Sequence, residues 1–401
     1  MALKLSKRVK SGYVIARGSA SSLALLFSLF YSKGLGVENR AIVTIVFVTG
    51  LISLTLFTSG FSLGFRSRAP LGLSHRNISA YFWLSILSAC AIAITSFLIL
   101  TLYSQIKSQI PVTLLVLAFV YTFWAALDDL SHQALLAYEK FKLAAIIDVA
   151  TVLMQIIFYV ILNFSHRISL ASSLFCSLII SYIISSILAL VFVLRELEVK
   201  LNFSFLAIRD LLIESKSLQM IGISGGFVDR IDRFLIAWFL PLSFLGSYSV
   251  GTSLLAYTRF VPEAVGRLIV AKQSTFRISF TRQSVFRWFL SILLVLFVAL
   301  SASIMSKVFV GIFLGDSWGL PTSVIMMFAL QEILRGYHAV IIADLVVNGQ
   351  PKFIKRLSVA LAPLSLGAGF LGLKFFGGVG VPFGIALTYA LLILIATVKS
   401  K

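Results

Sequence analysis

The 401 residues are 59% hydrophobic and only 12% charged, and their mean hydropathy is +1.02. Soluble domains carry about 25% charged residues, so this composition excludes an ordinary soluble protein and indicates one embedded in a membrane. The net charge of +19 does not require a nucleic-acid partner, because Lys and Arg also gather in the cytoplasmic loops of membrane proteins. No basic run interleaved with aromatic residues occurs, and no nucleic-acid partner is expected.

Twelve apolar runs are long enough to cross a bilayer as helices of about 20 residues. A mixed-charge connector, RELEVKLNFSFLAIRDLLIESKS, separates them into two sets of six. The sequence predicts an all-α polytopic membrane protein with an N-terminal lobe over 1–205 and a C-terminal lobe over 206–401. The predicted spans are 12–33, 42–65, 78–103, 111–137, 144–164, 170–194, 218–240, 244–270, 286–309, 320–345, 356–375 and 379–398.

The N-terminal segment and the segment between the last two spans each have more than one interpretation. MALKLSKRVK resembles the start of a signal peptide, but it continues into further spans without a clear cleavage site, which predicts an uncleaved first helix. Between the last two spans, GLKFFGGVGVPFGI is compatible with a tight turn or with a broken helix.

The distribution of Lys and Arg over alternate loops predicts the orientation. One side carries most of them, whereas the other carries only Lys33, Arg40, Lys107, Arg167, Lys307 and Lys374. Both termini are therefore predicted to lie in the cytoplasm. The loops of the opposite face are short, which disfavours polytopic glycosyltransferases and polymerases that carry a large external loop for chemistry.

Charged residues lie inside several spans. Each costs about 2.5–3.5 kcal/mol at the centre of a bilayer, so such residues should face protein or a wet cavity, and they usually mark a pathway. Asp128 and Asp129 lie near the predicted cytoplasmic end of their span, where a function and simple access to water are both open. The full set is Arg17, Asp128, Asp129, Asp229, Arg230, Asp232, Arg233, Arg259, Glu263, Arg267, Glu332 and Arg335.

The span 218–240 holds four of these charges. With about 100° of rotation per helical residue, Asp229, Arg230, Asp232 and Arg233 fall on one face together with small glycines. This predicts a polar wall along a cavity. The competing explanation is structural, because Asp229 with Arg233, Arg259 with Glu263, and Glu332 with Arg335 stand at spacings that allow ion pairs within one helix.

The segment GGFVDRIDRFLIAWFLPLSFLGSYSVGTSLL contains Asp232-Arg233, an apolar run, and Leu245-Gly246-Ser247-Tyr248 in a predicted loop. The first half adds a similar loop, GLGVENRAIV, which contains Leu35-Gly36. This pattern resembles the bacterial polysaccharide and O-antigen flippases (Wzx-type) of the multidrug/oligosaccharidyl-lipid/polysaccharide (MOP) exporter superfamily. In the first loop Val37 stands where the family has proline and Ala41 where it often has glycine.

The resemblance implies two six-helix lobes around a central cavity, a MATE-like fold, in a bacterial inner membrane. It also implies a flippase that carries undecaprenyl-pyrophosphate-linked glycan units from the cytoplasmic to the periplasmic leaflet, with membrane lipids and the polysaccharide polymerase and ligase machinery as partners. Guanidinium groups suit a pyrophosphate, because they form bidentate, charge-assisted hydrogen bonds. The candidate substrate-binding residues are Arg17, Arg233 and Arg259, followed by Arg230 and Arg335.

No cofactor or metal is expected, although transport can draw on an H⁺ gradient, a Na⁺ gradient or the membrane potential. The candidate groups for ion coupling or for cavity ion pairs are Asp229, Asp232, Glu263 and Glu332. Two other functions stay open. A cation-coupled drug antiporter of the MATE type is disfavoured because arginines would repel a cationic substrate, and a membrane glycosyltransferase or polymerase is disfavoured by the short external loops.

Overall fold

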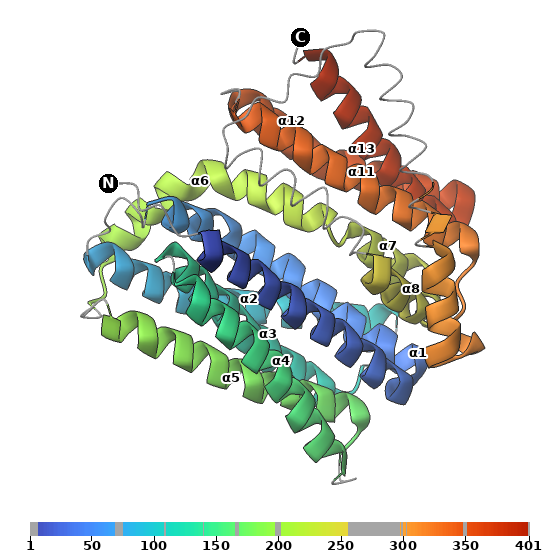
Figure 1. The fold of residues 1–401 in the computed structure, drawn as a ribbon, viewed down its shortest axis with the longest axis horizontal. Helices are drawn as coiled ribbons and strands as arrows, with labels where there is room; N and C mark the ends of the chain where they lie inside the picture. Colours follow the sequence, from blue (N-terminus) through green and yellow to red (C-terminus); the bar gives the residue numbers. More distant parts are fainter. Residues whose placement is uncertain are drawn as a thin grey trace. The chain divides into compact units, whose positions relative to one another are not determined.

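The structure is a computed structural model in which the regular elements of the described residues are all helical (Figure 1). Seven helices in the described part are long and apolar enough to cross a membrane, so the protein is a multi-pass membrane protein, as predicted. The described residues are 7–68, 75–107, 110–138, 140–164, 168–196, 202–255, 303–347 and 351–399, together with 297, 300 and 301.

The chain divides into two compact units. Unit 1 comprises Met1–Leu35 and Ile45–Ile223, and unit 2 comprises Gly36–Thr44 and Ser224–Lys401. The lobes predicted from the sequence meet earlier in the chain, after residue 205. A short segment of the first half, Gly36–Thr44, groups with the second.

Unit 1 contains α1 apart from Gly36–Thr44, the four helices that follow it, and the first part of α6. α1 contains the first two predicted spans, and the chain bends between them at Gly36, whose φ of 75° favours glycine. α3 packs against α2 and α5, and α4 packs against α5. The bounds are α1 (Lys7–Arg68), α2 (His75–Ile106), α3 (Val112–Ala137), α4 (Phe141–Phe164) and α5 (Leu170–Glu196).

Small residues explain the close packing of α5 within unit 1. Ser173, Ser177, Ser181 and Ser185 recur at every fourth position of α5, and each is at most 1% exposed. Positions four apart lie on one helix face, and small side chains there let neighbouring helices approach in a membrane, where apolar side chains gain little from leaving lipid. Ser181 donates its hydroxyl hydrogen bond to the carbonyl of Ser177, so the stripe adds no unsatisfied donor at that position.

Unit 2 contains the end of α6 and the later helices, in which α13 packs against α11 and α12 (Figure 1). The segment between the last two spans is a tight turn, η4, and not a broken helix. The bounds are α6 (Phe205–Val228), α7 (Ile231–Phe239), α8 (Leu242–Leu255), an unlabelled helix (Ser303–Leu314), η3 (Asp316–Trp318), α11 (Thr322–Val347), α12 (Pro351–Phe376), η4 (Gly377–Val379) and α13 (Gly380–Lys399).

Two predictions for the second half were wrong. The span 218–240 is not one helix: α6 begins at Phe205, inside the predicted connector, and ends at Val228, before α7 begins at Ile231. Leu245 and Gly246 lie in the first turns of α8 and not in a loop. The later part of the predicted span 244–270 and most of 286–309 lie outside the described residues.

Within unit 2, the Leu-Gly sequence of the second half contacts the segment that follows the Leu-Gly sequence of the first half. A Cβ at Gly246 would overlap the backbone carbonyl of Val37. Because the obstacle is backbone, no change of side-chain rotamer would remove the overlap. Gly246 is therefore required by a close approach of the two chain segments.

Candidate functional site: the break between α6 and α7

The charged residues of GGFVDRIDRFLIAWFL surround a two-residue break in the helix. The Asp229 amide still donates to the Gly225 carbonyl at 3.2 Å, but the Arg230 amide bonds to the Phe227 carbonyl at 3.0 Å, a tighter turn. Arg230 has φ −134° and ψ −1°, outside the helical range. The prediction that all four charges share the face of one continuous helix is therefore wrong, because Asp229 and Arg230 lie between the two helices and Asp232 belongs to α7.

The break frees backbone groups, and a side chain satisfies one of them. The guanidinium of Arg230 donates from Nη1 to the carbonyl of Gly226 at 2.8 Å, and it lies 3.9 Å from the carboxylate of Asp229. Carbonyls at the end of a helix lack partners along their own chain, and basic side chains often bind them there. Irregular backbone at membrane depth occurs where it is buried in protein or lines a water-filled cavity.

Arg335 of α11 is the partner of two carboxylates. Its Nη1 lies 3.2 Å from Oε1 of Glu332, one turn earlier on the same helix, and its Nη2 forms an ion pair with Oδ1 of Asp229. The ion pair that the spacing of Glu332 and Arg335 allows is formed. The pair that the spacing of Asp229 and Arg233 would allow is not among the ion pairs of the described residues, because Asp229 pairs with Arg335 of α11. This triad joins the end of α6 to α11 within unit 2.

Arg233 has a neutral partner. Its Nε and Nη2 donate to the hydroxyl of Thr252 on α8, at 3.3 and 3.1 Å, and the side chain is only partly buried. Among the described residues, no carboxylate forms an ion pair with it. Thr252 uses two of the five N–H donors of Arg233, so three donors remain for another ligand.

Asp232 is the most buried carboxylate of the site, at 1% exposure. Its Oδ2 accepts a hydrogen bond of 2.9 Å from the hydroxyl of Tyr248 on α8. Its Oδ1 is buried, and no described residue bonds to it. Such a buried oxygen costs free energy, so it indicates a site that a proton, cation or water can satisfy.

The sequence missed Tyr248 and Thr252 as partners of the charges. A signal for Tyr248 was present, because it closes the Leu-Gly-x-Tyr sequence that follows Asp232-Arg233. Thr252 lies four residues after Tyr248 on α8, and the i to i+4 spacing places both on one face of that helix. The two hydroxyls bind the neighbouring charges Asp232 and Arg233.

The remaining predicted residues lie elsewhere or are not described. Arg17 lies in α1 within unit 1, and its side chain is outside the described part, as are Arg259, Glu263 and Arg267 in full. The two acidic residues of α3, Asp128 and Asp129, lie in unit 1 and are partly buried. Asp129 accepts a 3.5 Å hydrogen bond from Gln133.

A contact between His132 and Asp148 in unit 1 was not predicted from the sequence. Nδ1 of His132, which the sequence gave no metal spacing or other role, lies 3.5 Å from the carboxylate of Asp148 on α4. The pair connects two helices that follow each other in the chain. Neither residue showed a spacing within one helix that could have predicted the contact.

Comparison with known proteins assigns the sequence to a family. A family model described as polysaccharide biosynthesis protein matches residues 41–346. A curated relative from Haloferax volcanii, described as the probable low-salt glycan biosynthesis flippase Agl15, is 27% identical over 192 residues. That match spans 47% of this chain and 41% of the relative, so the chain matches less than half of the relative's length.

Solved structures share the fold. The lipid II flippase MurJ in an inward closed conformation aligns with a TM-score of 0.72 at 14% identity, over 97% of this chain and 87% of that chain. An inward-facing MATE family transporter of the MOP superfamily aligns with a TM-score of 0.65 at 14% identity, over 96% of each chain. The predicted MATE-like fold is confirmed. Since the family model covers more than half of the sequence, the protein belongs to the polysaccharide biosynthesis protein family.

Proposed function

We propose that this protein is a flippase for lipid-linked glycans and that Arg233 binds the anionic group that joins lipid and sugar. The observation that carries the proposal is the guanidinium of Arg233, which lies in a membrane-spanning unit and bonds to a neutral hydroxyl instead of a carboxylate. A charge without an ionic partner costs free energy inside a membrane protein. A pyrophosphate that forms bidentate hydrogen bonds to the guanidinium would offset this cost.

The other arginines take different roles in this proposal. Arg335 is engaged by Asp229 and Glu332 and so holds the site together, whereas Arg230 is bound to the Gly226 carbonyl and is a secondary contact. Arg17 and Arg259 remain proposed substrate contacts on the strength of the sequence. The guanidinium of Arg233 also disfavours a drug antiporter, because it would repel an organic cation.

The finer assignment rests on the family and on the neighbours together. The family is one of polysaccharide biosynthesis proteins, the Haloferax relative is described as a glycan biosynthesis flippase, and MurJ as a lipid II flippase. We therefore propose undecaprenyl-pyrophosphate-linked repeat units as substrate, moved by alternating access from the cytoplasmic to the periplasmic leaflet of the inner membrane. Both termini lie in the cytoplasm in this scheme, and the polysaccharide polymerase and ligase act on the product.

Asp232 is the proposed coupling group for an ion gradient. Of the four acidic candidates, Asp229 and Glu332 bind Arg335, and Glu263 lies outside the described residues. Asp232 differs from these two in that its hydrogen-bond partner is the neutral hydroxyl of Tyr248. Its Oδ1 is buried, and no described residue bonds to it. A proton or a small cation that enters with the gradient would satisfy this oxygen.

Loss of function tests the proposal. Cells that lack the protein should accumulate lipid-linked oligosaccharide in the cytoplasmic leaflet and lose surface glycan. Arg233→Ala should reach the membrane at the wild-type level and fail to restore surface glycan. Arg209→Ala is the matched control, because Arg209 is exposed on α6, 3.9 Å from Asp210, and should restore it. Full restoration by Arg233→Ala would overturn the role of Arg233, and no accumulation on deletion would overturn the flippase itself.

A further inference from the structure

The ionisable groups inside the spans of α2 to α5 gather in one place, and the proposed transport site does not include them. Apart from residues at the helix ends, the charged or histidine side chains of these spans are Asp128, Asp129 and His132 on α3 and Asp148 on α4. Such groups are costly inside a membrane and usually serve a function. All of them lie towards the end of unit 1 that the distribution of Lys and Arg assigns to the cytoplasm.

His132 lies near the carboxylates of two helices. Its Nδ1 is 3.5 Å from Oδ1 of Asp148, and the two side chains are 13% and 28% exposed. Asp128 and Asp129 precede His132 by four and three residues on α3, which places them on the same side of that helix. Asp129 and Asp148 both lie close enough to Asp128 to act on it electrostatically. The imidazole therefore lies in negatively charged surroundings.

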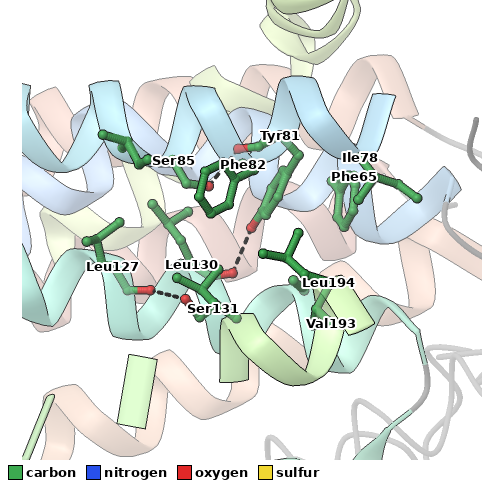
Figure 2. A pocket seen from close by; sticks show the side chains of 13 residues that line it. Phe65, Ile78, Tyr81, Phe82, Ser85, Leu127, Leu130, Ser131, Val193 and Leu194 are labelled. Atoms are coloured by element: carbon green, nitrogen blue, oxygen red, sulfur yellow. Dashed lines mark hydrogen bonds between the residues drawn. The ribbon is translucent and has the colours of Figure 1, made fainter. Parts of the chain in front are cut away.

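The side of α3 that faces α2 does not offset this negative charge. The hydroxyl of Tyr81 on α2 donates to the Leu130 carbonyl at 3.0 Å, as Figure 2 shows. Ser131 donates to the Leu127 carbonyl at 2.6 Å in the same view. The span of α2 contains no Asp, Glu, His, Lys or Arg. Its tyrosines stay neutral near neutral pH, because a phenol ordinarily loses its proton only near about pH 10.

The other helices that pack against α3 are α4 and α5. On α5, Ser185 forms a hydrogen bond with Asp128, and Tyr182 lies close to the same carboxylate. The basic residues at this end lie in the loop before α4 and at the helix ends, and they are Lys140, Lys142 and Arg195. Of all these residue types, histidine is the one whose ordinary pKa lies near neutral pH.

We infer that His132 and Asp148 form a pH-sensitive contact that ties α3 to α4 when the imidazole is protonated. An imidazolium donates a charge-assisted hydrogen bond to a carboxylate, which is roughly twice as strong as the bond of a neutral donor. Both side chains are partly exposed, so protons can reach them. The contact is strong in acid and weakens as the pH rises through the range in which histidine loses its proton. The packing of unit 1 thus responds to the pH on the cytoplasmic side, whatever substrate the protein carries.

Thermal unfolding of the full-length protein in detergent, at about pH 5.5 and about pH 8.5, tests this contact. At the lower pH, wild type should unfold about 2 °C above His132→Gln, a shift typical of a partly exposed ion pair. At the higher pH the difference should vanish. Asp148→Asn should show the same loss in acid, and the double variant should lose no more than either single variant, because both substitutions remove one interaction.

Two further variants separate this contact from other sources of pH dependence. In an Asp128→Asn background, His132→Gln should still lower the unfolding temperature in acid only. His338→Gln is the matched control, because His338 on α11 is also buried, but it lies against the Tyr389 ring and the charge that acts on it is that of Arg335. A second positive charge is disfavoured there, so this substitution should have the same effect at both pH values.

A difference between wild type and His132→Gln that is equal at both pH values would overturn the inference. A double variant whose loss equals the sum of the two single losses would do the same, because independent side chains add. If the effect of His132→Gln disappears in the Asp128→Asn background, the imidazole acts through Asp128 and the assignment to Asp148 is wrong. Asp148→Glu keeps the carboxylate and should retain the pH-dependent difference, so the test does not rest on charge-removing variants alone.

Discussion

Arg335 on α11 forms an ion pair with Asp229, the residue that follows the last turn of α6. The same guanidinium binds Glu332, which is 2% exposed. One guanidinium therefore binds two carboxylates and joins the helix break to α11. Arg335, Asp229 and Glu332 are thus bound to one another, whereas the guanidinium of Arg233 bonds to the neutral hydroxyl of Thr252.

Removal of Arg335 should destabilise the protein strongly. Arg335→Met removes the guanidinium that Asp229 and the buried Glu332 share, and removing one partner of a buried ion pair costs about 3–5 kcal/mol. Unfolding in detergent should therefore occur at a clearly lower temperature. Lys307→Met is the control, since Lys307 is exposed and bonds only to the Thr322 hydroxyl among the described residues, and should change stability by less than about 0.5 kcal/mol. Equal effects of the two substitutions would contradict the triad.

Arg233 and Thr252 should differ in their effects on transport. Arg233→Lys keeps the charge but loses the planar pair of donors, so flipping should fall well below that of wild type. Thr252→Val removes only the acceptor that orients the guanidinium, a loss of about 0.5–1.5 kcal/mol and at most roughly tenfold in apparent affinity. Surface glycan and flipping in proteoliposomes measure both. A larger loss from Thr252→Val than from Arg233→Lys would contradict the assignment of the anion contact to Arg233.

The hydrogen bond between Tyr248 and Asp232 should contribute to stability. Tyr248→Phe removes the donor to a carboxylate that is 1% exposed, and leaving such a group unsatisfied costs about 1–3 kcal/mol. Denaturation of the purified variant in detergent measures the loss. Tyr337→Phe on α11 is the matched control, because no hydrogen bond of that hydroxyl is found among the described residues, and its effect should stay within about 0.5 kcal/mol.

Asp232→Asn should uncouple transport from its driving gradient. The amide keeps the shape of the side chain but neither titrates nor neutralises a cation, so flipping in proteoliposomes should lose its dependence on an imposed H⁺ or Na⁺ gradient. Glu332→Gln should keep that dependence, because Glu332 binds Arg335 in this site. A gradient response that survives in Asp232→Asn and disappears in Glu332→Gln would transfer the coupling role to Glu332.

Gly246 should tolerate no side chain. Gly246→Ala places a Cβ against the backbone carbonyl of Val37, and the resulting overlap should cost about 1–3 kcal/mol. Gly367→Ala in α12 meets no atom within 4 Å and should leave stability unchanged or raise it by about 0.5–1 kcal/mol. Thermal unfolding of the two variants under the same conditions measures the difference in stability between them. Recovery of Gly246→Ala by Val37→Ala would show that the obstacle is the side chain of Val37 and not its carbonyl.

Hydropathy predicted the helical architecture because each crossing needs a long apolar run, and α2 to α5 follow the predicted spans closely. It did not predict α6, whose first turns carry Arg209 and Asp210, both more than half exposed. These residues extend a helix beyond the apolar run. Hydropathy predicts which segments are apolar enough to lie in lipid, but it does not predict how far a helix continues beyond the membrane.

The sequence singled out the charged residues around the helix break but did not predict which of them contact one another. Charges inside apolar spans identified Asp229, Asp232, Arg233 and Arg335 from the sequence alone. The helix break contains no proline that would have predicted it. It is stabilised by Arg335, which lies too far from Asp229 in the sequence for a spacing rule to predict their contact. Spacing rules apply within one continuous helix, so they failed for Asp229 and Arg233 and succeeded for Glu332 and Arg335.

The grouping of Gly36–Thr44 with the second half of the chain has a consequence for biogenesis. Val37 emerges from the ribosome about 200 residues before Gly246, its contact in unit 2. At about 5–20 residues per second, that interval lasts roughly 10–40 s. The bend at Gly36 is therefore synthesised early, but its contact with Gly246 forms only after the second half has been made. An N-terminal half synthesised by itself would enter the membrane without the partner of Val37.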